Sequence, residues 1–195
     1  MSGPRLLSWI AVAIAVMCTA LAMSASASSE GAHLIVRWTA RTSLALFLLA
    51  YVARPLVVHW PSPATKAVLA RRKWIGLGFA LSHLAHLGGI VAIAAPDFAG
   101  FVRSQKPTII VALLAYVVLF AMAITSIDAV RARISAPAWK RLHRFGIHLL
   151  WVPFASTYAG AMFVEPVFAI PTALLVAAAV LRFTARSSRS RPRPA

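Results

Sequence analysis

Cysteine and acidic side chains are scarce in this chain. Of 195 residues one is cysteine, Cys18, so the chain cannot form a disulfide framework or a cysteine-rich metal site by itself. The four acids are isolated, and the sequence contains no paired carboxylates, nucleophile triad or phosphate-binding glycine loop. These absences exclude a self-contained catalytic site of those kinds. Cys18 lies in an apolar run and is predicted to be a small buried thiol.

Apolar residues, in contrast, are abundant. They make up 61% of the chain against 12% charged residues, and the mean hydropathy is +0.80. A soluble domain of this size must wet its surface and does not need so much apolar sequence. We therefore expect an all-α integral membrane protein. Six apolar segments approach the roughly 20 residues that cross a bilayer, at 6–27, 40–59, 74–95, 107–125, 143–163 and 167–184.

Lysine and arginine are distributed unevenly around these segments. When the N-terminus is placed in the cytoplasm, all but four of the 20 basic residues fall on the cytoplasmic side. The exceptions are Arg37, Arg41, Arg103 and Lys106. Because basic residues mark cytoplasmic loops, the pattern predicts a multi-pass inner-membrane bundle of six helices with both termini cytoplasmic. Topology and anionic lipid then explain the net charge of +16, and we expect no nucleic-acid partner.

The two ends of the chain differ from its middle. Residues 1–35 carry the first apolar segment, which is either a retained helix, as its length favours, or a signal peptide cleaved after Ala25-Ser26-Ala27. Cleavage would leave five spans in the same orientation. Residues 36–184 form the predicted membrane domain. The Arg-, Ser- and Pro-rich residues 185–195 are predicted to be a disordered cytoplasmic tail that lies against lipid.

Four of the six histidines lie within two of the apolar segments, 74–95 and 143–163. Ionisable groups in a bilayer are costly, usually face a bundle interior, and mark a cofactor, proton or ion path. His83 and His86 are three residues apart and share one helix face, whereas His143 and His148 differ by about 140° around their helix. Imidazoles on neighbouring helices can also hold a haem iron from both sides. These histidines are therefore the main functional candidates.

Depth in the membrane indicates which histidines can pair. At 1.5 Å per residue, His83 lies about 15 Å and His86 about 20 Å from the cytoplasmic end of their segment. On the same scale, His143 lies about 3 Å and His148 about 10 Å deep. His83 and His148 are thus the best match, about one helical turn apart. The alternative for the deep pair is structural: a neutral imidazole that hydrogen-bonds to a serine or threonine on a neighbouring helix.

Several short motifs together carry a family resemblance. They are Arg41-Thr42-Ser43-Leu44, Arg54-Pro55-Leu56, Arg71-Arg72-Lys73-Trp74-Ile75-Gly76-Leu77 with His86 ten residues after the glycine, Thr125-Ser126, and Trp139-Lys140-Arg141-Leu142-His143-Arg144. In this order and spacing they resemble the ferric-reductase-like transmembrane domain over about residues 36–160. Within that family the chain looks most similar to the haem-binding membrane subunit of the bacterial periplasmic methionine-sulfoxide reductase system.

The resemblance implies a six-helix bundle that holds one or two b-type haems and passes electrons across the membrane. By position, His86 matches the family's ligand on the third helix and His143 matches the ligand that opens the fifth. The family expects another histidine thirteen residues later, where this chain has Ser156. His148 could compensate with His83. One haem, a five-coordinate haem and no haem at all remain open alternatives.

Two hypotheses follow from these observations. The first is a b-type cytochrome subunit of an oxidoreductase, reduced by quinol or a cytoplasmic flavin reductase and oxidised by a periplasmic partner. The residues expected to contact haem, as iron ligands or propionate partners, are His83, His86, His143, His148, Arg71, Arg72 and Arg141. The second hypothesis is a haem-free scaffold in the bilayer that anchors a partner protein. A proton-coupled carrier is disfavoured because no acid lies within a span.

Overall fold

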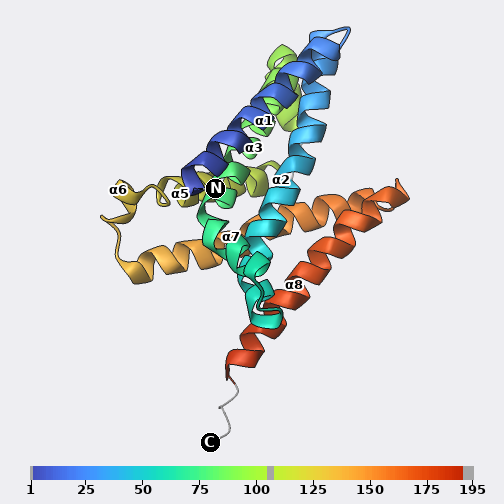
Figure 1. Ribbon diagram of the computed structural model, residues 1–195. Coiled ribbons are helices and arrows are strands. Elements are labelled where there is room, and N and C mark those ends of the chain that lie inside the picture. Colours follow the sequence, from blue (N-terminus) through green and yellow to red (C-terminus); the bar gives the residue numbers. More distant parts are fainter. Residues whose placement is uncertain (1, 105–107, 191–195) are drawn as a thin grey trace, which may run out of the picture.

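The computed structural model describes residues 2–104 and 108–190, and these residues form helices without any strand (Figure 1). The predicted all-α class is therefore confirmed. The helices are α1 (Gly3–Ser24), α2 (Ser28–His59), α3 (Pro63–Ala94), α4 (Phe98–Ser104), α5 (Thr108–Ile124), α6 (Asp128–Arg131), α7 (Ala136–Ala161) and α8 (Ala169–Ser190), with short 3-10 helices at Ala95–Asp97 and Pro166–Phe168.

Membrane-spanning length is reached by four helical stretches of the described chain. Gly3–Ser24, Ser28–His59, Pro63–Ser104 and Pro166–Arg186 are each long and apolar enough to cross a bilayer. A shorter apolar helix covers Ile109–Ile124. The protein is thus a helical membrane protein, while the number of spans and their orientation stay predictions. The predicted start of the fourth span, residue 107, lies outside the described residues.

Several helix ends differ from those expected from hydropathy. α3 begins at Pro63, well before the apolar segment at 74, because the Ser62 and Thr65 side chains and backbone amides form a reciprocal capping box. At the other end of the chain, α8 continues to Ser190, so the first six residues of the predicted tail are helical. The remainder, residues 191–195, lies outside the described part.

Pro55 does not end α2, which continues to His59. A proline has no backbone N–H, so the carbonyl of Tyr51, four residues earlier, loses its usual helical donor. Arg182 of α8 supplies a substitute, because its Nη1 donates to the Tyr51 carbonyl at 2.8 Å. Arg72 of α3 donates from Nε to the neighbouring carbonyl of Ala50 at 2.9 Å. Two arginines thus join α2 to α3 and α8 at this point, and the proline accounts for the free carbonyl that accepts from Arg182.

α2 and α3 form the most extensive helix pair, and a buried hydrogen-bond chain crosses it. Ser43 donates from Oγ to Ser82 Oγ at 2.9 Å, and Ser82 donates to the Thr39 carbonyl at 3.1 Å. All three residues are fully buried, at 0% exposure. Gly89 permits the close approach, because a Cβ at that position would stand 2.7 Å from a Val36 methyl group. Small residues let membrane helices pack closely in this way.

The core lies where α2, α3, α5, α7 and α8 meet. Phe47 of α2 is 2% exposed and contacts the rings of Tyr51, Phe79 and Phe154, with centroids between 5.2 and 5.5 Å apart. α8 contributes Leu175, which is fully buried. α7 and α8 form a hairpin, and α8 returns along α2 (Figure 1). This packing brings the predicted histidines of α3 and α7, but not Arg141, into the helix bundle.

Candidate functional site

The first group of candidate residues is the α3 histidine cluster, which we define as His83, His86, Phe79, Tyr116 and Phe154. The ring of His83 stacks on His86 and on Tyr116, with centroid separations of 5.1 and 5.0 Å. Phe79 lies 5.4 Å and Phe154 5.8 Å from the same ring. Aromatic and imidazole rings from α3, α5 and α7 therefore fill the space around His83.

His86 at the edge of this cluster is attached to α2. Its Nδ1 lies 3.0 Å from the Val36 carbonyl and 3.2 Å from Thr39 Oγ1. Since a carbonyl oxygen can only accept, Nδ1 carries the proton and Nε2 keeps its lone pair. The bond is an interhelical contact of the kind that also orients imidazoles at metal sites. This geometry is compatible with a role in helix packing and with a role in metal binding. Which role applies depends on what surrounds Nε2.

Two polar atoms in the cluster are buried without a hydrogen-bond partner among the described residues. They are Nδ1 of His83 and the hydroxyl of Tyr116. Ser156, which stands where the resemblance expects a histidine, is exposed and donates to the Pro153 carbonyl of its own helix at 3.2 Å. No imidazole-sized ligand reaches the cluster from that position of α7.

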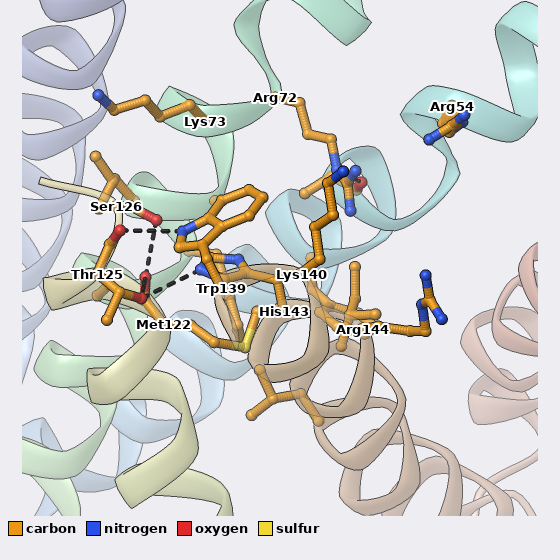
Figure 2. Close-up of a pocket in the computed structure, with 18 of the residues that line it drawn as sticks. Arg54, Arg72, Lys73, Met122, Thr125, Ser126, Trp139, Lys140, His143 and Arg144 are labelled. Atoms are coloured by element: carbon orange, nitrogen blue, oxygen red, sulfur yellow. Dashed lines mark hydrogen bonds between the residues drawn. The ribbon is translucent and has the colours of Figure 1, made fainter. Parts of the chain in front are cut away.

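The second group surrounds a cavity of about 770 Å³, which we call the basic cavity (Figure 2). Cofactor sites typically enclose roughly 300–1,000 Å³. α2, α3, α5, α7 and α8 all contribute to its walls. Of the chain's six histidines, all of which the structure describes, His143 lines this cavity. Apolar residues make up most of the remaining lining, and eight lining side chains are cationic, namely Arg54, Arg72, Lys73, Arg131, Lys140, Arg144, Arg182 and Arg186.

His143 is held in place by Thr125 and Trp139. Its Nε2 lies 3.2 Å from Thr125 Oγ1, and the Thr125 hydroxyl donates to the Ala121 carbonyl at 2.7 Å. Because the Thr125 hydroxyl proton is used in the bond to Ala121, Nε2–H of His143 donates to the hydroxyl oxygen. Nδ1 of His143 then keeps its lone pair. Trp139 stacks on the imidazole at 4.1 Å between centroids and donates from Nε1 to the Thr125 carbonyl at 3.1 Å (Figure 2).

Positive charge in the basic cavity is poorly balanced. Asp128 is the one acid among the described lining residues, and Lys73 pairs with it at 2.6 Å. Arg72 and Arg182 are held by backbone carbonyls rather than carboxylates, and Arg182 also lies over the Tyr51 ring at 4.7 Å. Partly buried charges without counter-ions are costly. The cavity is therefore suited to an anionic group.

The other predicted residues lie apart from the basic cavity. Arg71 donates to the Ala67 carbonyl of its own helix at 3.4 Å, and Arg141 is exposed. His148 faces α2, with its ring edge-on to Tyr51 at 6.1 Å and its Nε2 buried without a partner among the described residues. His83 instead faces α5, so the structure does not bring together the His83–His148 pair favoured by depth.

Sequence reasoning missed four residues of the site: Thr125 and Trp139 around His143, and Tyr51 and Arg182 at the α2 proline. The spacing of Trp139 and His143 is four residues, which places both on one helix face. Pro55 likewise indicates a free carbonyl at Tyr51. Arg182 is different, because no local pattern shows that the last helix returns to α2.

Comparison with known proteins identifies the family. The model of the ferric reductase like transmembrane component matches residues 36–154, which is more than half of the chain. The chain belongs to this family, and the membership indicates a membrane redox or electron-transfer component. No protein of curated function and no solved structure matches the chain.

Proposed function

We propose that this protein is a membrane b-type cytochrome with one haem in the basic cavity, bound through His143. The observation that carries the proposal is the combination, in one cavity of about 770 Å³, of an oriented imidazole and a cationic lining. Both features suit haem, because an imidazole can bind its iron and its two propionates are anionic. The α3 histidine cluster has the imidazoles but, being filled by rings, lacks the space.

Each part of the cavity has a separate task in this proposal. Thr125 and Trp139 fix the orientation of His143, as outer partners of metal-bound histidines do. Arg72 and Arg182 pair with the propionates, and the apolar walls around Phe79 and Leu150 exclude water. The bound haem supplies one-electron redox chemistry, and the protein tunes its potential through ligand identity, burial and neighbouring charge.

The direction of electron flow follows from the proposed topology. With six spans and both termini in the cytoplasm, the basic cavity opens toward the cytoplasmic side of the inner membrane, because its arginines belong to the loops assigned to that side. A cytoplasmic flavin reductase or quinol is then the donor. The family resemblance supports a periplasmic oxidoreductase as the acceptor. A reporter fused after Ala195 should give a cytoplasmic signal; a periplasmic signal would contradict this orientation.

The experiment that tests the proposal measures haem by reduced-minus-oxidised spectra and pyridine haemochrome in the detergent-purified protein from haem-supplied cells. We expect about one b-type haem per chain. His143→Ala should abolish it, whereas the double variant His83→Ala/His86→Ala should keep it. Loss of haem in the double variant with retention in His143→Ala would move the site to the α3 histidine cluster.

A second candidate function, a haem-free membrane scaffold, is favoured by one specific observation. The family position that expects a histidine on α7 is Ser156, and its side chain is exposed. His86 and His83 then act as packing residues between α2, α3 and α5. The absence of a Soret band from the wild-type protein, despite haem supply and normal membrane insertion, would select this function over the first.

A further inference from the structure

Three exposed arginines of the basic cavity lie on its α2, α7 and α8 walls, and we call them the arginine rim: Arg54, Arg144 and Arg186. None of them makes a hydrogen bond or an ion pair within the described part of the chain. Figure 2 shows Arg54 and Arg144 on the side of the cavity away from Lys73. Lys73 pairs with Asp128, the one acid among the described lining residues. The charge of the arginine rim is therefore not balanced by these residues.

Two further guanidinium groups of the cavity are half-buried next to the rim. Arg72 and Arg182 donate to the carbonyls of two consecutive α2 residues, Ala50 and Tyr51, so two like charges are fixed on one helix. Nε of Arg182 is buried without a hydrogen-bond partner in the described chain. Arg186 follows Arg182 by one helical turn and extends the same charged face of α8. An anion at the arginine rim would reduce the repulsion among these cations.

The surroundings of the arginine rim favour an amphiphilic anion over a free ion. Arg186 is the last residue of its membrane-length stretch, and Arg54 lies in the last turns of its own. The headgroup region of a bilayer lies where spanning helices end. Phe145 of α7 and Val180 of α8 are 60% and 55% exposed, so the helices that carry the rim also present apolar surface. The cations suit a phosphate, and the apolar surface suits acyl chains.

We propose that the arginine rim binds the phosphate-bearing headgroup of an anionic phospholipid, whose acyl chains lie along the exposed apolar faces of α7 and α8. Basic pockets between membrane helices bind anionic headgroups in this way. A guanidinium can also offer a phosphate two parallel N–H bonds, and three arginines far apart in the sequence meet at one cavity. The lipid site goes beyond the proposed haem site, because it uses the exposed arginines and leaves Arg72 and Arg182 to the cavity interior.

Basic residues on the cytoplasmic side attract anionic lipid in general, so the experiment must separate a binding site from overall charge. Arg5, Arg133 and Arg141 provide a matched control. All three are exposed, do not line the basic cavity, and are predicted to lie on the same side of the membrane as the arginine rim. Their replacement by glutamine removes as much charge as the same replacement in the rim.

The test counts bound lipid by native mass spectrometry, on the purified full-length protein released from micelles that contain phosphatidylglycerol and phosphatidylcholine in equal amounts. We expect the wild-type protein to retain phosphatidylglycerol preferentially, and less of it at high ionic strength. Arg54→Gln/Arg144→Gln/Arg186→Gln should weaken this binding about fivefold for each charge removed. The control triple variant should bind like the wild-type protein. Arg54→Lys/Arg144→Lys/Arg186→Lys should keep most of the binding, which separates loss of charge from misfolding.

Three outcomes would overturn the proposal. Equal losses in the rim and control variants would assign the binding to overall charge. A wild-type protein without preference for phosphatidylglycerol, or with a preference that salt does not weaken, would exclude a headgroup site of this kind. Release of the lipid by inorganic phosphate, but not by chloride of equal ionic strength, would assign the rim to a soluble anion. None of these measurements depends on haem, so a haem-free protein that retains phosphatidylglycerol would overturn the cytochrome function and support the lipid site.

Discussion

The α3 histidine cluster and the basic cavity contain the same type of side chain in opposite surroundings. In the cluster, His83 touches four rings and His86 is bonded to the α2 backbone. In the cavity, His143 is held by Thr125 and Trp139 beside about 770 Å³ of space and eight cationic side chains. One membrane histidine is thus used for packing, whereas the other lies beside free volume and positive charge, and the proposed haem site rests on this difference.

The largest effect should come from filling the cavity. Gly76 and Gly88 both lie on α3, and a Cβ at either position meets no atom within 4 Å, but Gly76 lines the basic cavity and Gly88 does not. Gly76→Phe should weaken haem binding by more than about tenfold, the equivalent of about 1.4 kcal/mol. Gly88→Phe is the matched control and should bind haem normally. Equal haem content in the two variants would show that the cofactor lies elsewhere.

A moderate effect is expected at the wall that α8 contributes to the cavity. Arg182→Met leaves the Tyr51 carbonyl without its donor and should lower the free energy of unfolding by about 1–3 kcal/mol. In a Pro55→Ala background the restored backbone N–H can bond to that carbonyl, so the same substitution should cost less. Thermal unfolding in detergent measures the cost of Arg182→Met in the wild-type background and in the Pro55→Ala background. Equal costs in the two backgrounds would mean that the proline does not create the arginine site.

Removing a hydroxyl from the buried chain between α2 and α3 should have a smaller effect. Ser82→Ala deprives Ser43 of its acceptor and the Thr39 carbonyl of its donor. Interhelical hydrogen bonds in membranes average about 0.6 kcal/mol, and we expect a loss of stability of about 0.5–2 kcal/mol with unchanged haem content. Haem determination alongside the unfolding curve checks the second part. A variant of normal stability that lost haem would connect this region to the cofactor after all.

The smallest effect is expected where the family resemblance suggests the largest. Ser156→His restores the histidine that the family expects, but position 156 is exposed and the rings of the α3 histidine cluster occupy the interior. We therefore expect no additional haem and an unchanged reduced spectrum. A second haem per chain in this variant would show that the cluster can open, and that one substitution separates this chain from a two-haem relative.

The sequence predicted the helical class and the membrane location because composition alone limits both. It also singled out Arg72 and His143, each in a recognisable motif, and both line the basic cavity, whereas their role in a site stays a prediction. The sequence could not show whether His83 or His143 is the better candidate for haem. Helical spacing gives the direction in which a side chain leaves its helix, but it does not show which neighbouring residues occupy the space there. The depth estimate favoured His83 with His148, yet the ring of His83 stacks on Tyr116 of α5, whereas the ring of His148 lies against Tyr51 of α2. Arg182 was missed because its role depends on the return of α8 to α2.

The arginine bonded at Pro55 also has a consequence for biogenesis. A chain is synthesised from its N-terminus, and its early parts can assemble first. The basic cavity, however, takes Arg182 and Arg186 from α8, which is synthesised after all the other helices of the described residues. Until that helix docks, the Tyr51 carbonyl is without its arginine and one wall of the cavity is missing. Loading of the proposed haem would therefore be a late event in maturation, because a nascent chain that stops before α8 has an incomplete pocket.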